Sequence, residues 1–191
     1  MSKGRLEAFS DGVLAIIITI MVLELKIPHE AGPEALRPLV PKFLSYVLSF
    51  IFLGIYWNNH HHLFQAARQV NGRVLWANLN LLFWLSLIPF ATGWMGENHF
   101  ASWTVALYGL DLLLAAIAYI ILTRILVACH GADSTLAAAI GRDFKGKVSL
   151  ALYIAAIPLA FVSPWIACAL YVVVVAIWLI PDRRIEKALA G

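Results

Sequence analysis

Polar side chains interrupt three apolar stretches near the beginning of the chain. Ser10 and Asp11 come directly before an uncharged apolar run, and Asn78 lies near the start of a later one. His60 and His61 lie towards the end of the run between them. All four residue types exchange hydrogen bonds, and histidine also binds metals. These residues could therefore form either a hydrogen-bonded network or a metal site, depending on where the helices place them.

A shared metal ion is the less favourable use of the histidines. Metal ligands on one helix face lie three or four residues apart, whereas His60, His61 and His62 are consecutive and spread around the helix. The sequence contains no second histidine or carboxylate cluster at the same depth and no nucleophile motif such as Gly-x-Ser-x-Gly. It therefore predicts no metal site, no cofactor and no enzymatic activity.

Asp111 is the polar residue that is hardest to reconcile with its surroundings. It lies inside an apolar run at residues 101–126, where a charge near the bilayer centre costs about 2.5 to 3.5 kcal/mol on insertion scales. Such a residue is a functional candidate by default. The structural alternative is a neutral carboxyl group that donates to a backbone carbonyl or a polar side chain. No cation stands at its depth, so the sequence indicates no partner.

The elements that carry these residues are apolar enough to lie in a lipid bilayer. The 191 residues are 62% hydrophobic and 13% charged, with a mean hydropathy of +0.83, whereas an average soluble domain is about 45 to 50% apolar. A helical span needs about 20 mostly apolar residues, so the chain has room for six spans. This composition argues against a soluble enzyme and against a nucleic-acid-binding protein.

Six transmembrane helices in an all-α membrane protein are predicted from the apolar runs, which form a single domain over residues 1–191. The spans cover about residues 8–27, 43–65, 74–95, 101–126, 147–162 and 164–181. Of the 14 Lys and Arg residues, all but Lys26, Arg37 and Lys42 fall on the side of the termini. By the positive-inside rule, we expect a multi-pass protein of the inner (plasma) membrane with both termini in the cytosol.

This topology brings the first group of polar residues to one depth. Asp11 lies at the cytosolic start of the first span, His60 near the cytosolic end of the second, and Asn78 near the start of the third. Arg5 and Ser10 approach the same layer from the amino-terminal arm. We favour a buried hydrogen-bond network that fixes the first span against the next two. The alternative is helix capping by Ser10 or Asp11, with the other polar residues at the membrane interface.

An apolar stripe runs along the first predicted helix. Ile16, Ile20 and Leu23 are spaced i, i+4 and i+7, which places them on one face, and Thr19 lies beside them. Such residues usually face lipid or pack against other helices, and the Thr19 hydroxyl can bond back to the carbonyl of Ala15. From the residues alone, this structural role is favoured.

A motif at the start of the chain suggests another role for this stripe. The segment Arg5–Gly12 reads RLEAFSDG and continues into Val13–Leu23. It resembles the first helix of the transmembrane protein 175 family of potassium channels, whose bacterial and endolysosomal members carry an R-x-x-x-F-S-D-G signature. The resemblance to a bacterial member extends through Trp57–His61, Asn78–Leu79 and Pro89–Phe90. It covers the first three spans, while the later spans match only in number and hydrophobicity.

The resemblance implies a homotetramer of six-span subunits, surrounded by membrane lipids, with a central pore lined by the first helix. This pore would pass potassium and other monovalent cations. The sequence lacks the Thr-Val-Gly-Tyr-Gly filter of ordinary potassium channels. By position in the motif, Ile16, Ile20 and Leu23 correspond to an apolar pore constriction that acts as the gate, and Thr19 corresponds to a selectivity residue. The implied network that holds the pore helix comprises Arg5, Phe9, Ser10, Asp11, His60 and His61.

The alternative function is a proton-coupled membrane transporter that uses Asp111 and the histidine layer as relay sites. An intramembrane carboxylate favours it. The lack of an inverted repeat and of paired broken helices argues against it. Asp111 belongs to no pattern of the family, and His62 stands where a basic residue is expected. The resemblance therefore assigns no role to the fourth span.

Overall fold

The computed structural model describes residues 2–29, 31–131, 136–137 and 143–179, and these residues form helices without β-strands. The elements are α1 (Lys3–Leu23), the 3-10 helix η1 (Pro33–Leu39), α2 (Val40–Ala66), α3 (Gly72–Glu97), α4 (Ser102–His130), α6 (Phe144–Leu159) and α7 (Pro164–Leu179). Four segments, α1, η1 with α2, α3 and α4, are long and apolar enough to cross a membrane, and α7 is a shorter apolar helix. The chain is thus an all-helical, multi-pass membrane protein.

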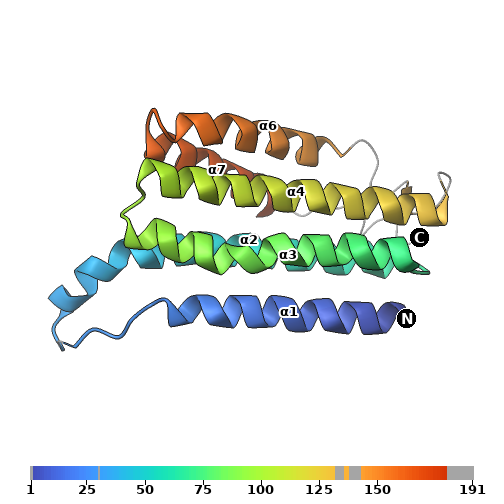
Figure 1. Cartoon of the computed structure of the whole chain (residues 1–191), viewed down its shortest axis with the longest axis horizontal. Coiled ribbons are helices and arrows are strands. Elements are labelled where there is room, and N and C mark those ends of the chain that lie inside the picture. Colours follow the sequence, from blue (N-terminus) through green and yellow to red (C-terminus); the bar gives the residue numbers. More distant parts are fainter. Residues whose placement is uncertain (1, 30, 132–135, 138–142, 180–191) are drawn as a thin grey trace.

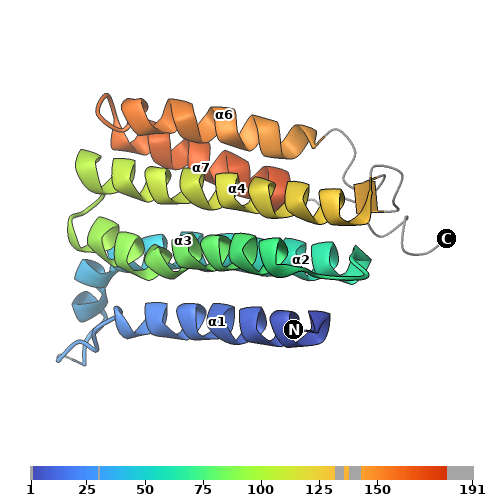
Figure 2. The same ribbon diagram turned by 45° about the vertical axis from the view of Figure 1, so that its right-hand side comes forward.

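The helices run side by side as a bundle with α1 at one edge (Figures 1 and 2). Helix α1 packs against α2 and α3, and α3 packs against α4. At the opposite edge, α6 and α7 pack against each other and against α4, and α7 also contacts α2. The pairings leave α1 attached to the rest of the subunit through α2 and α3.

Hydroxyl groups link the helices inside the largely apolar core. The Ser49 hydroxyl of α2 lies 2.6 Å from that of Thr92 on α3 and 2.9 Å from that of Tyr108 on α4. Tyr171 of α7 donates to the backbone carbonyl of Val105, at 3.0 Å. Buried polar groups are costly unless they are paired, so these contacts fix the relative positions of four helices.

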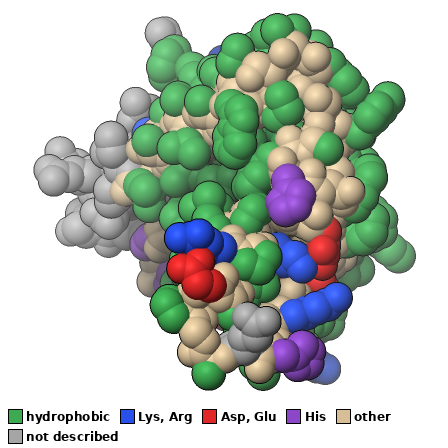
Figure 3. Space-filling model, turned by 90° about the vertical axis from the view of Figure 1, so that its left-hand side faces the viewer, with side chains coloured by type: hydrophobic (Ala, Val, Ile, Leu, Met, Phe, Trp, Pro, Cys, Tyr) green, Lys and Arg blue, Asp and Glu red, His purple; other side chains and the backbone are tan. Residues whose placement is uncertain are grey.

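The helices approach closely at one end of the bundle. A Cβ atom at Gly96 of α3 would collide with the backbone of Lys42 and the hydroxyl of Ser45 on α2. Beside this contact, Lys42 Nζ lies 2.6 Å from a carboxylate oxygen of Glu97. Figure 3 shows this end, where charged and histidine side chains gather on one part of an otherwise largely hydrophobic surface. That pattern suits a membrane–water boundary.

Helix α1 begins earlier than the first predicted span. It starts at Lys3, with Ser2 as its N-cap residue and no side-chain cap. Ser10 and Asp11 therefore lie about two turns inside the helix, and the capping interpretation is wrong. At its other end, the helix stops at Leu23, before Pro28 and the proline-containing η1. The end of the sixth predicted span, at residues 180–181, lies outside the described residues.

Candidate functional site

A chain of three buried hydrogen bonds joins α1, α2 and α3. The side-chain amide of Asn78 donates to the Ser10 hydroxyl at 2.9 Å, and Ser10 in turn donates to the carbonyl of Leu6 at 2.9 Å. The carbonyl oxygen of the Asn78 side chain lies 2.8 Å from His60 Nε2. Since that oxygen only accepts, Nε2 carries the proton. All three side chains are buried, so the bonds are shielded from water.

A second link joins α1 to α2 one residue further along. The indole N–H of Trp57 donates to Asp11 Oδ1 at 3.0 Å. The Trp57 ring also stacks on His61, with 6.1 Å between centroids and 20° between planes. No role was predicted for Trp57. Its position four residues before His61, on the same helix face, is the signal that could have indicated one.

The structure does not bring Arg5 and Phe9 into these links. Both side chains are exposed on α1, and the described residues offer neither of them a hydrogen bond, ion pair or ring contact. Of the predicted network residues, Ser10, Asn78 and His60 are therefore bonded directly to one another. Asp11 and His61 are connected through Trp57, and Arg5 and Phe9 lie apart from both groups.

Helix α1 presents two different faces. Leu14, Ile17 and Met21 are 1%, 4% and 1% exposed, because this face packs against α2 and α3. The predicted stripe lies on the opposite face, where the exposed fractions of Ile16, Ile20 and Leu23 are 58%, 45% and 75%. Within one subunit, this apolar face is uncovered.

Thr19 is also exposed on α1, next to the stripe. Its hydroxyl donates to the carbonyl of Ile16 at 2.9 Å, rather than to that of Ala15. Because a hydroxyl has one proton and two lone pairs, this bond leaves the oxygen able to accept a further hydrogen bond or to face a cation.

Asp111 lies in α4 and is 7% exposed. Neither of its carboxylate oxygens has a hydrogen-bond partner in the part of the chain that the structure describes. The predicted alternative, a carboxyl group bonded to a carbonyl or a polar side chain, is therefore not what the structure contains. Asp111 remains a buried carboxyl group outside the links around α1.

The consecutive histidines point to different neighbours. His60 contacts Asn78, whereas His61 stacks on Trp57. Over the described ranges, no group of three His, Cys, Asp or Glu side chains lies close enough to hold a metal ion. His60 therefore connects α2 to α3, whereas the stacking of His61 on Trp57 lies within α2.

Comparison with known proteins places this arrangement among ion channels. The family model described as "Endosomal/lysosomal potassium channel TMEM175" matches residues 5–89. A potassium channel of Chryseobacterium sp. (strain P1-3) is 58% identical over 189 residues, which cover 99% of this chain and 98% of that protein. The human endosomal/lysosomal proton channel TMEM175 is 33% identical over 103 residues, which cover 48% of this chain and 20% of that larger protein.

A solved structure shares the fold. The crystal structure of a lysosomal potassium-selective channel TMEM175 homologue from Chamaesiphon minutus superposes with a TM-score of 0.80 at 29% sequence identity. The match covers 94% of this chain and 97% of that chain. The resemblance carried by the RLEAFSDG motif is thus confirmed, and the chain belongs to the TMEM175 family.

Proposed function

We propose that this protein is a potassium-selective cation channel in which four six-span subunits surround a central pore lined by α1. The observation that carries the proposal is the uncovered apolar face of α1, opposite the face that packs on α2 and α3. In a symmetric tetramer, four copies of one side chain form a ring around the axis. The apolar stripes of the four subunits would then face one another and bury their exposed surface. The names of the relatives, potassium channel and proton channel, support ion permeation.

The stripe residues serve as the gate in this proposal. Rings of Ile16, Ile20 and Leu23 that touch across the axis would exclude water, and an ion stripped of water in an apolar ring loses most of its solvation energy. Opening would require the rings to separate enough for a partly hydrated ion. Thr19 lies beside the rings, and its hydroxyl oxygen would replace some of the lost water. We assign selectivity to this residue.

Two side-chain links near the cytosolic end, one buried at Ser10 and one exposed at Asp11, would hold the pore helix in place. Ser10 and Asp11 each connect α1 to a neighbouring helix through a directional bond. Such bonds fix rotation as well as position, and rotation determines which side chains face the axis. Under the positive-inside rule, both termini and these links lie on the cytosolic side.

Ion flux from liposomes tests the proposal. Purified protein reconstituted in vesicles should pass potassium faster than sodium under otherwise identical gradients, and native mass spectrometry in detergent should give the mass of four chains. The same vesicles with an internal pH-sensitive dye report proton flux, which the names of the animal relatives make relevant. Flux no greater than that of empty vesicles, or a monomer as the sole species, would contradict the proposal.

One observation favours a second candidate, proton-coupled transport through Asp111. A buried carboxyl group without a partner is typical of proton relays. However, Asp111 lies nine residues after the start of α4 and His60 lies twenty after the start of α2. Because these helices run in the same direction (Figure 1), the two layers differ in depth by roughly 15 Å. A relay would therefore need further groups between them.

A further inference from the structure

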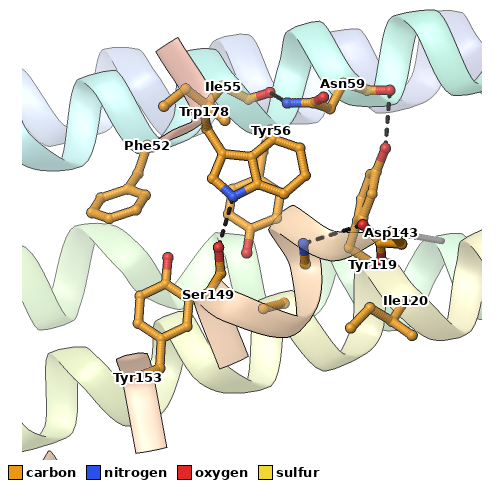
Figure 4. Close-up of a pocket in the computed structure, with 12 residues that line it drawn as sticks. Phe52, Ile55, Tyr56, Asn59, Tyr119, Ile120, Asp143, Ser149, Tyr153 and Trp178 are labelled. Atoms are coloured by element: carbon orange, nitrogen blue, oxygen red, sulfur yellow. Dashed lines mark hydrogen bonds between the residues drawn. The ribbon is translucent and has the colours of Figure 1, made fainter. Parts of the chain in front are cut away.

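A cavity of about 50 Å³ lies between α2, α4, α6 and α7. It takes no lining residue from α1 or α3, so it is separate from the face assigned to the pore. One water molecule needs about 10 to 15 Å³ on a comparable measure, so the cavity has room for several waters or one small organic ion. Figure 4 shows the residues around it.

Aromatic rings form much of the cavity wall. Tyr56, Tyr119, Tyr153 and Trp178 all line it, and the rings of Tyr56 and Tyr119 meet edge to face, with 6.2 Å between centroids. The face of such a ring attracts cations, most strongly in tryptophan. Trp178 already has one cation nearby, since Lys145 Nζ lies 5.8 Å from its ring centroid. The wall is therefore suited to a positively charged group.

The hydrogen-bond donors around the cavity are largely taken up by the protein itself. The indole N–H of Trp178 donates to the Ser149 hydroxyl at 2.9 Å. The Tyr119 hydroxyl donates to the backbone carbonyl of Asn59 at 3.2 Å, and the Asn59 side-chain amide donates to the carbonyl of Ile55 at 2.8 Å. Among the described residues, no Lys, Arg or His lines the cavity. Apart from the Lys145 ammonium near Trp178 and the Tyr153 hydroxyl, the described lining offers an anion few groups to bind.

Among the described lining residues, acceptors and the carboxylate of Asp143 remain available. Tyr153 is 2% exposed, and its hydroxyl, which points towards the cavity in Figure 4, has no hydrogen-bond partner among the described residues. Asp143 Oδ1 accepts from the backbone N–H of Gly146 at 3.1 Å, which leaves the second carboxylate oxygen able to accept a further hydrogen bond. These groups complement a ligand that donates hydrogen bonds and carries a positive charge.

We propose that this cavity binds a small organic ammonium ion, with its cationic head between the faces of Tyr56, Tyr119 and Trp178 and close to the carboxylate of Asp143. Aromatic walls around a single carboxylate favour an ammonium group over a metal cation. A hard metal cation such as Ca²⁺ takes about six to eight oxygen ligands, whereas aromatic rings form much of this lining. The site is independent of ion conduction through the pore.

Ligand-observed NMR on the full chain in detergent tests the proposal. Tetramethylammonium and methylammonium chlorides serve as probes in sodium chloride at constant ionic strength. Saturation of the protein's aromatic protons should transfer to the methyl protons of the probe, and a titration gives Kd. Repeating the titration with potassium chloride in place of sodium chloride distinguishes this site from the pore, because potassium would displace a probe that is bound in the pore. Absence of transfer, or displacement by potassium, would overturn the proposal.

Matched variants locate the site. Asp143→Asn removes the charge, yet asparagine still caps α6 and tolerates the positive φ of 39° at this position. We expect about tenfold weaker binding, and a similar loss for Trp178→Leu. As controls, Glu97→Gln removes a carboxylate charge and Trp165→Leu removes an indole ring at positions that do not line the cavity. Both should leave Kd unchanged. If Trp178→Leu does not fold, Tyr153→Phe provides a milder test. Unchanged Kd in folded Asp143→Asn and in a folded cavity-wall variant would refute the site.

Discussion

Asn78 of α3 donates a hydrogen bond to Ser10 of α1 while its other side-chain atom accepts one from His60 of α2. A single buried amide thus connects three helices, and each of its polar atoms is satisfied. In such a network, each bond depends on the others, because loss of one member leaves its neighbours unpaired in a dry environment.

Replacing Asn78 should therefore destabilise the fold. Asn78→Leu keeps the approximate size of the side chain but leaves the N–H of His60 without an acceptor. We expect a loss of about 2 to 3 kcal/mol, measured as a lower unfolding temperature in detergent. Asn80→Leu, at an exposed position on the same helix, is the control and should change stability by less than about 0.5 kcal/mol. Equal effects of the two changes would argue against the network.

A polar residue in the stripe should open the proposed gate. Ile20→Asn would let water wet a ring that is otherwise apolar, so basal potassium flux in liposomes should rise several-fold. Ile20→Leu keeps the ring apolar at nearly constant volume and should retain the flux of the parent. If Ile20→Asn forms a stable oligomer with unchanged flux, Ile20 is not part of the gate.

The hydroxyl of Thr19 should determine ion preference. Thr19→Val has nearly the same shape but no oxygen to face the ion, so we expect the ratio of potassium to sodium flux to fall. Thr19→Ser retains the hydroxyl and should retain most of the preference. Reversal potentials with potassium on one side and sodium on the other measure the ratio. A Thr19→Val channel as selective as the parent would move selectivity to another residue.

Asp111 distinguishes the channel from the transporter. Its carboxyl group is buried without a partner among the described residues, and such a group costs stability. For a channel with its pore along α1, Asp111→Asn should leave potassium flux unchanged, and Asp111→Leu, which removes the unpaired polar group, should raise stability by about 1 to 3 kcal/mol. A proton-coupled transporter would instead lose uptake that depends on a pH gradient. Both readouts come from one preparation.

Close packing between α4 and α7 should make Gly109 intolerant of a side chain. A Cβ atom at this position would clash with the Tyr171 hydroxyl and break its bond to Val105. Gly109→Ala should cost about 1 to 3 kcal/mol. Gly54→Ala in α2, where a Cβ atom meets nothing within 4 Å, should instead be neutral or stabilising by up to about 1 kcal/mol. Thermal unfolding of both variants tests the contrast.

Part of the site followed from the sequence because depth in a membrane can be counted along a helix. The shared depth of Ser10, His60 and Asn78 predicted that they could meet, and the structure brings them together. The contact between Trp57 and Asp11 was missed, since it depends on how α1 and α2 are rotated against each other. The capping interpretation failed because α1 starts at Lys3, in a segment too polar to be counted as part of the span.

The second half of the chain was less predictable. Its helices were expected from their hydrophobicity, but no motif indicated which side chains they bring together. The cavity lined by Tyr56, Tyr119 and Trp178 arises only when α6 and α7 pack on α2 and α4. A partner for Asp111 could not be identified from the sequence, and the described structure offers its carboxylate oxygens none.

The attachments of α1 differ along its length. Among the described residues, its side-chain hydrogen bonds to the rest of the subunit involve Lys3, Ser10 and Asp11, which all lie in the first half of the helix. Beyond Asp11, the described contacts with α2 and α3 are apolar, through Leu14, Ile17 and Met21. Apolar contacts are non-directional and permit sliding, whereas hydrogen bonds do not. Directional bonds therefore anchor α1 near its amino-terminal end, whereas the part that carries Ile16, Ile20 and Leu23 is held by apolar packing alone among the described residues.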